Sequence, residues 1–180
     1  LKTERELHQT HVKFCRDFIR SRQDHLLAHL PTEKLRSFVD AFVQLCLYPR
    51  IRLGHEDALF AFEFIVIMTK MGVENFPTLF ILDKVVKELF PCLICMTDNE
   101  AEGFANFMYE FIRQMERWRS NKNLFRKEFG SLPGALEDPY TPESTALVTH
   151  SNFLKVMAKW SNVIARLLKE CLQPHVLLKV

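Results

Sequence analysis

The clearest helical pattern in the chain runs from Thr97 to Gly134 and reads TDNEAEGFANFMYEFIRQMERWRSNKNLFRKEFGSLPG. It opens with a capping-box pattern, Thr97-x-x-Glu100, in which two side chains bind the first free backbone N–H groups of a helix. Apolar residues then recur three and four positions apart, which places them on one helix face: Phe104, Phe107, Met108, Phe111, Ile112, Met115 and Trp118. The stretch therefore predicts a long core helix, a cationic exit and a stop at Pro133-Gly134.

The same helical periodicity extends on both sides of this stretch. Helices are predicted over about 4–29, 32–48, 56–71, 75–93, 97–118, 121–129 and 151–172. Thr32 and Asn75 are the predicted N-caps of two of them, and Pro91 is expected to kink or break the fourth helix near Leu89. The third helix is apolar nearly all round, which predicts neighbours on both sides. The Pro-rich, acidic segment 130–148 is expected to be an exposed loop.

Together these elements predict an all-α fold. Short connections favour antiparallel helix pairs, stacked as an α-solenoid segment of about seven helices within a single unit, 1–180. The chain has no initiator methionine and begins inside a helical pattern. We therefore expect it to be an excerpt of a longer protein.

Composition excludes several classes of protein. Only five of the 180 residues are glycine, and no P-loop, GxGxxG or GxSxG motif occurs. A net charge of +2 gives no global attraction to nucleic acid or to a membrane surface. No apolar run approaches the ~20 residues that span a bilayer, so no membrane partner is expected. Five cysteines, an odd number, favour a reducing compartment, the cytosol or the nucleus.

Two patterns of metal-ligand type invite a functional interpretation. Cys92-x-x-Cys95 lacks a second cysteine or histidine pair at zinc-site spacing, so both residues are interpreted as packing cysteines. The pairs His8/His11 and His25/His29 lack the glutamate of a metalloprotease motif and lie among charged residues. We therefore expect no catalytic residue, cofactor or metal, and no enzyme.

The one local charge anomaly lies between Arg113 and Phe129, where six cations face two glutamates, a net charge of +4. The candidate site residues are Arg113, Arg117, Arg119, Lys122, Arg126 and Lys127. Cations near a helix C-terminus stabilise the helix dipole, which is a sufficient structural reason for them. Interleaved with Trp118, Phe125 and Phe129, they also fit a surface for RNA or an acidic partner. Both interpretations remain open, although Trp118 falls on the core face of its helix.

Several stretches resemble a known family, the large scaffold subunit of the THO complex. The likeness is carried by LCLYPRIRLGHEDALFAFEFI (45–65), NFPTLFILDKV (75–85) and the opening stretch. The family's motif positions are occupied by Pro49, Arg50, Asp57, Ala58, Phe76, Thr78, Leu79, Thr97, Asn99, Glu100, Ala101, Arg117, Trp118, Phe125, Lys127, Glu128, Pro133, Gly134, Asn152, Phe153, Lys159 and Trp160. The resemblance covers roughly 45–172.

The resemblance implies a non-enzymatic α-helical scaffold segment from the C-terminal half of a nuclear protein. Its partners would be other THO subunits and a DEAD-box RNA helicase within the TREX assembly, which couples transcription to mRNA processing and export. RNA or ribonucleoprotein would be a further partner, and no catalytic residue carries over. Two alternatives stay open: an RNA-binding helical repeat, and an adaptor module of another nuclear or translational assembly.

Overall fold

The computed structural model describes residues 10, 13–14, 17–22, 25–140 and 146–170. Within these ranges the fold contains helices and one isolated β-bridge, between Leu136 and Leu147, so the all-α prediction is confirmed. The α-helices are α2 (Thr32–Ala41), α3 (Tyr48–Ile51), α4 (His55–Lys70), α5 (Thr78–Lys84), α6 (Asp98–Ser120), α7 (Lys122–Phe125) and α8 (His150–Glu170).

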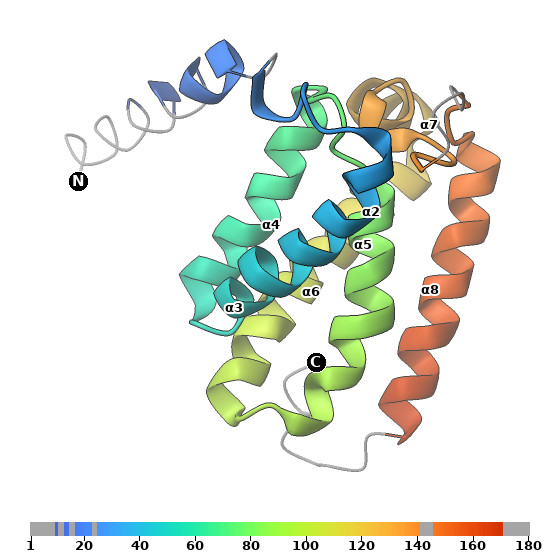
Figure 1. The fold of residues 1–180 in the computed structure, drawn as a ribbon. Coiled ribbons are helices and arrows are strands. Elements are labelled where there is room, and N and C mark those ends of the chain that lie inside the picture. Colours follow the sequence, from blue (N-terminus) through green and yellow to red (C-terminus); the bar gives the residue numbers. More distant parts are fainter. Residues whose placement is uncertain (1–9, 11–12, 15–16, 23–24, 141–145, 171–180) are drawn as a thin grey trace.

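The long helices form one packed body. In Figure 1, α4 and α8 stand on opposite sides, with α5 and α6 between them and α2 crossing in front. Aromatic pairs join the layers. The rings of Phe62 on α4 and Phe107 on α6 are 5.6 Å apart, and those of Phe111 and Trp160 on α6 and α8 are also 5.6 Å apart. Stacking of helix pairs into a longer solenoid stays a prediction.

Helical residues before α2 project away from this body at the upper left of Figure 1. The described parts of the predicted first helix are helical at 10, 13–14, 17–22 and 25–26, whereas Leu7 lies outside the described residues. Phe14 and Phe18 stack at 6.3 Å and remain exposed. Ile19 packs against the core, so one side of this segment contacts the body.

The second predicted helix does not stop before Pro49. After α2 the chain widens into a π-helical segment (Phe42–Leu47) and continues into α3, where Pro49 takes a first-turn position. Tyr48 N–H donates to the carbonyl of Val43, five residues back. A wider turn relieves the demand for an amide donor that proline cannot supply. The N-cap is Pro31 rather than Thr32, so that prediction was wrong.

The fourth predicted helix changes its winding twice. It runs as α5, then as a π-helical segment (Val85–Leu89), then as a 3₁₀ helix (Phe90–Cys95). Regular α-helix thus ends ahead of Pro91, as expected of a residue without an amide donor. Its N-cap is Pro77, not Asn75. Asn75 instead takes a left-handed turn conformation (φ 56°) and donates its side-chain amide to the Leu27 carbonyl at 3.0 Å.

The capping box that opens α6 is confirmed. The backbone N–H of Thr97 donates to the Glu100 carboxylate at 2.9 Å. This bond, together with the Arg52 guanidinium, holds the pKa of Glu100 below its ordinary value. The predicted core face is buried except at Ile112, whose side chain is 50% exposed because it lies at the edge of the apolar stripe.

The segment 130–148, expected to be an exposed loop, is partly packed in its described portion. A 3₁₀ turn (Pro133–Ala135) and the Leu136–Leu147 bridge hold it against the helices. Ala135 and Val148 are buried, whereas the acidic residues of the segment that the structure describes are exposed. An added Cβ at Gly134 would lie 2.5 Å from the Thr78 hydroxyl oxygen, so only glycine fits this contact.

Candidate protein-interaction site

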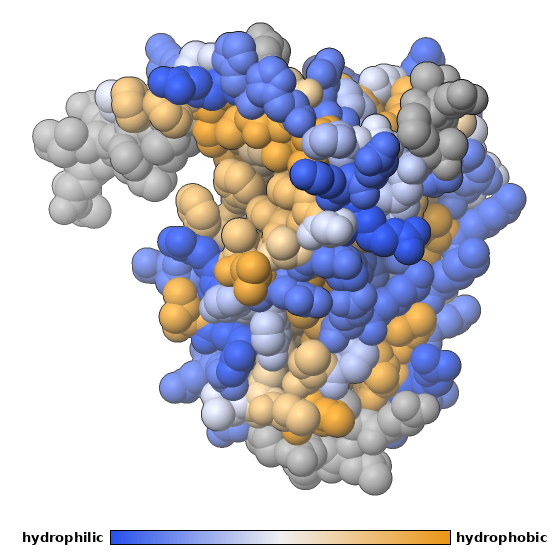
Figure 2. Space-filling model, in the orientation of Figure 1, coloured by the Kyte–Doolittle hydropathy of each residue, from blue (hydrophilic) through white to orange (hydrophobic). Residues whose placement is uncertain are grey.

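Three exposed apolar residues lie close together around α3 and α4. Leu45 is 74% exposed, Leu53 is 73% exposed and Phe60 is 56% exposed. Together with half-buried Phe42 and Phe64 they surround a groove of about 540 Å³. We call these five residues the α3–α4 face. Figure 2 shows apolar side chains gathered over the part of the molecule where Figure 1 places α3 and α4.

Local helix geometry places these side chains. Leu45 lies in the π-helical segment before α3, and Leu53 lies in the short turn that leads into α4. Phe60 and Phe64, one helical turn apart on α4, stack at 6.3 Å. The inner side of α4 packs on α6 through Phe62. Phe64 also contacts Phe42 of the π-helical segment, with ring centres 6.3 Å apart. The prediction that α4 has neighbours on both sides is therefore met in part, since Phe60 remains exposed.

Charged residues border the α3–α4 face. Arg50 forms an ion pair with Asp57 (3.0 Å) across the turn between α3 and α4, and its guanidinium lies 4.9 Å from the centre of the Phe60 ring. Arg52 pairs with Glu100 at the start of α6 and lies over the Tyr48 ring. An apolar centre with a polar rim is the usual composition of a protein–protein interface.

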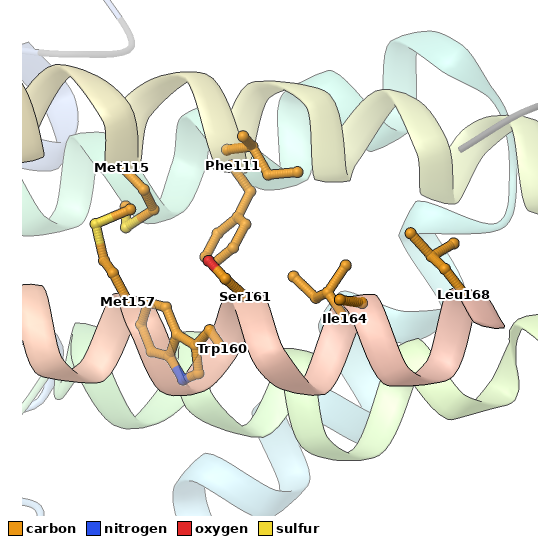
Figure 3. A pocket seen from close by; sticks show the side chains of 9 residues that line it. Phe111, Met115, Met157, Trp160, Ser161, Ile164 and Leu168 are labelled. Atoms are coloured by element: carbon orange, nitrogen blue, oxygen red, sulfur yellow. The ribbon is translucent and has the colours of Figure 1, made fainter. Parts of the chain in front are cut away.

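A second apolar groove, of about 230 Å³, lies between α6 and α8. In Figure 3, Met115 and Phe111 of α6 face Met157 and Trp160 of α8 across this groove. The Trp160 indole N–H donates to the Asp83 carboxylate at 2.8 Å, which ties α8 to α5. This groove is less than half the volume of the one on the α3–α4 face, and buried rings form its floor.

All six candidate cations are exposed, but they differ in their partners. Arg113 pairs with Glu110 at 2.8 Å, Arg119 binds Glu116 through two hydrogen bonds of 2.6 Å, and Arg117 lies 3.7 Å from Glu128. Among the described residues, Lys122, Arg126 and Lys127 have no carboxylate within ion-pair distance. Of the six candidate cations, the three without a described ion-pair partner therefore lie in residues 122–130, which we call the α7 turn.

The aromatic residues interleaved with these cations belong to the core. Trp118, Phe125 and Phe129 are at most 3% exposed, as was predicted for Trp118. The ring of Trp118 stacks on that of Phe129 at 4.9 Å, and the rings of Phe125 and Phe153 lie 4.9 Å apart. None of the three is available to stack on a base.

Glu128 links this aromatic cluster to the neighbouring cations. Its carboxylate accepts the indole N–H of Trp118 at 3.1 Å and forms an ion pair with Lys70 at 3.3 Å. Burial alone would raise the pKa of Glu128, but the hydrogen bond from Trp118 and the charges of Lys70 and Arg117 outweigh it and hold the pKa below its ordinary value. No sequence pattern indicated this pairing.

The residues with metal-ligand chemistry do not converge in the described part of the chain. No group of three or more histidine, cysteine, aspartate or glutamate side chains there could hold a metal ion. Cys92 is half-buried against the core, whereas Cys95 is exposed because it ends the 3₁₀ segment, so the packing interpretation was wrong for Cys95. Within the described ranges, no helix is both long and apolar enough to cross a membrane.

Fold and surface define a class: an all-α segment with an exposed apolar face, typical of helical proteins that hold partners. Comparison with known proteins then identifies the family. The family described as "Transcription factor/nuclear export subunit protein 2" (Tho2) matches residues 1–177, and the chain belongs to this family. No solved structure matches the chain.

Curated relatives agree with the family assignment. The chain is 29% identical over 176 residues to THO complex subunit 2 of Arabidopsis thaliana, which covers 97% of the chain and 10% of that protein. It is 24% identical over 178 residues to THO complex subunit 2 of Homo sapiens and of Mus musculus, covering 96% of the chain and 11% of each relative. The chain thus spans about a tenth of the length of these relatives.

Several family motif residues make structural contacts in the fold. Arg50 binds Asp57, and Trp118 binds Glu128. The hydroxyl oxygen of Thr78 lies 2.7 Å from that of Thr69, against the Pro133-Gly134 turn. Each pair joins two helices or closes a turn, so the motifs describe architecture.

Proposed function

We propose that the chain is a scaffold segment of the THO complex and that the α3–α4 face holds a protein partner. Membership of the Tho2 family supports the first part. The observation that carries the second is the exposure of Leu45, Leu53 and Phe60 around one groove. Apolar surface concentrated in this way is stabilised when a partner removes it from water.

The finer role follows the family. Within the nucleus, the segment would support assembly of the other THO subunits and a DEAD-box RNA helicase, for transcription-coupled mRNA processing and nuclear export. Support comes from the family description, which names a nuclear export subunit, and from relatives named as THO complex subunit 2. Because the chain spans about a tenth of those relatives, these partners are proposed for the protein that contains it.

A non-enzymatic role is part of the proposal. The structural contacts of the family motif residues support it. These contacts join helices or close turns, and they are made by Arg50, Thr78, Trp118 and Glu128. Residues that serve packing in this way do not converge on a cavity as the groups of an active site must.

The alternative of an RNA-binding module has less support. Three of its six cations face carboxylates on or beside their own helix, and its aromatic residues are buried. A phosphate-tracking surface needs uncompensated cations along its length and accessible rings.

Affinity purification tests the function. An affinity-tagged copy of the protein, expressed at its native level, should recover the other THO subunits and a DEAD-box RNA helicase after nuclease treatment. Recovery of THO subunits without the helicase would remove the helicase role alone. Recovery of neither would contradict the proposed function as a whole, and recovery that depends on intact RNA would favour the RNA-binding alternative.

A further inference from the structure

A third groove, of about 880 Å³, lies between the α7 turn and the start of α8. Lys122 and Arg126, one helical turn apart, lie on one side of it, and Leu147 and Leu154 line it from the other segments. Among the described residues that line the groove, none is an aspartate or a glutamate. The groove is therefore cationic at one side and partly apolar.

The charge of this groove is not compensated within the described part of the chain. Lys122 and Arg126 are exposed and have no carboxylate at ion-pair distance there, unlike Arg113 and Arg119 one element earlier. A concave surface of one charge sign raises the local concentration of ligands of the opposite sign. The ligand indicated is an anion.

Exposed leucine side chains in the same groove indicate an anionic ligand that also carries an apolar group. Leu147 and Leu154 are each 38% exposed, and buried Phe125 and Val148 form part of the lining beneath them. A free phosphate would leave these leucines in water. A peptide that carries carboxylates beside a large apolar side chain would match both parts of the surface.

Nucleic acid fits the groove less well. Among the described residues that line it, two are uncompensated cations, and the aromatic residue, Phe125, is 3% exposed and cannot stack on a base. RNA-binding surfaces combine several phosphate contacts with accessible aromatic rings. The geometry favours a protein ligand.

We propose that the groove between α7 and α8 binds an acidic, leucine-bearing peptide segment of a partner protein. Carboxylates of the peptide bind Lys122 and Arg126, and its apolar side chain packs on Leu147 and Leu154. This site uses none of the residues of the α3–α4 face, so it is independent of the interface proposed above.

Selection from a random peptide library displayed on phage, with the purified chain as bait, tests the site. Enriched peptides should combine aspartate or glutamate with leucine or phenylalanine. Measured by fluorescence anisotropy, an enriched peptide should bind the double variant Lys122→Glu/Arg126→Glu at least about tenfold more weakly than the unmodified chain. Leu154→Ala should weaken binding in the same assay without changing the charge.

The matched control is Lys155→Glu/Lys159→Glu, which makes the same charge change at two exposed positions of α8 outside the groove lining. It should leave peptide affinity within about twofold. No enrichment of acidic peptides, or equal binding by the groove variant and the unmodified chain, would overturn the proposal. Oligouridylate that binds the groove more tightly than the enriched peptide, and is lost in the same variant, would assign the groove to RNA instead.

Discussion

The indole nitrogen of Trp118 lies 3.1 Å from a carboxylate oxygen of Glu128, and this hydrogen bond joins α6 to the turn that follows α7. Both residues belong to motifs through which the chain resembles its family. Trp118 is buried between Phe129 and Phe153, and Glu128 also pairs with Lys70 of α4. The Glu128 carboxylate thus connects α4, α6 and the α7 turn. Its hydrogen bond with Trp118 holds the α7 turn against α6.

Substitution of this carboxylate should weaken the fold in a pH-dependent way. Glu128→Gln keeps a hydrogen-bond acceptor for Trp118 but removes the charge that faces Lys70 and Arg117. We expect a loss of about 1 kcal/mol in the free energy of unfolding at pH 7, measured by urea denaturation. Glu63→Gln, at an exposed position of α4, is the control and should change stability little.

The sign of the pH effect follows from the lowered pKa of folded Glu128. At pH values between the folded and the unfolded pKa, the unfolded state binds more protons at this position than the folded state. The ionised Glu128 carboxylate therefore makes its full contribution to the free energy of unfolding above the ordinary glutamate pKa of about 4.3. That contribution is lost as the pH falls through the folded pKa. The stability difference between the unmodified chain and Glu128→Gln should therefore be largest near neutral pH and shrink in acid. A difference that grows below about pH 4 would contradict the assigned pairing.

Gly103 allows α6 to approach the end of α3. A Cβ at this position would lie 2.3 Å from the backbone carbonyl oxygen of Ile51, which cannot move without displacing the turn before α4. Gly103→Ala should therefore lower the free energy of unfolding by about 1–3 kcal/mol despite the higher helix propensity of alanine. Gly54→Ala is the matched control, since a Cβ there meets nothing within 4 Å. Equal stability of the two variants in thermal denaturation would show that the approach is looser than described.

The hydrogen bond between the buried hydroxyl groups of Thr69 and Thr78 should give a measurable interaction energy in the free energy of unfolding. Thr69 donates to the Ile65 carbonyl at 2.6 Å, which leaves Thr78 as donor across the 2.7 Å contact with Thr69. Thr78→Val removes that donor and should cost about 1 kcal/mol. A double-mutant cycle with Thr69→Val should give an interaction energy of at least about 0.5 kcal/mol, and additive single effects would rule the bond out.

Sequence periodicity predicted the helices well, because burial of an apolar stripe dominates their formation. The core face of α6 and its capping box were both predicted. The break in the fourth helix ahead of Pro91 was predicted, but its π-helical and 3₁₀ winding was not, nor was the continuation of the second helix through Pro49, since a proline can be accommodated by a wider or tighter turn as well as by a stop. The role of Gly103 depends on a contact with a residue fifty-two positions away, which no local pattern encodes.

The candidate sites were harder to predict than the fold. Apolar residues all round α4 indicated neighbours on both sides, but sequence does not distinguish a neighbour in the same chain from a partner protein. Phe60 therefore became informative only through its exposure. The six cations were identified from charge alone. The structure divides them into arginines on α6 that pair with glutamates and residues of the α7 turn that do not. Arg113 and Arg119 pair with a glutamate one helical turn away, whereas Arg117 pairs with Glu128 through a tertiary contact.

A charged substitution on the α3–α4 face shows whether this face holds a partner. Leu53→Glu/Phe60→Glu, introduced into the tagged protein, should reduce recovery of at least one THO subunit or of the helicase by about tenfold or more, because it places two carboxylates in an apolar contact. Tyr109→Glu, at a position of α6 that is 63% exposed and outside this face, should leave recovery unchanged. Circular dichroism should show the same helix content in both variants. Full recovery of every partner with the double variant would contradict the claim.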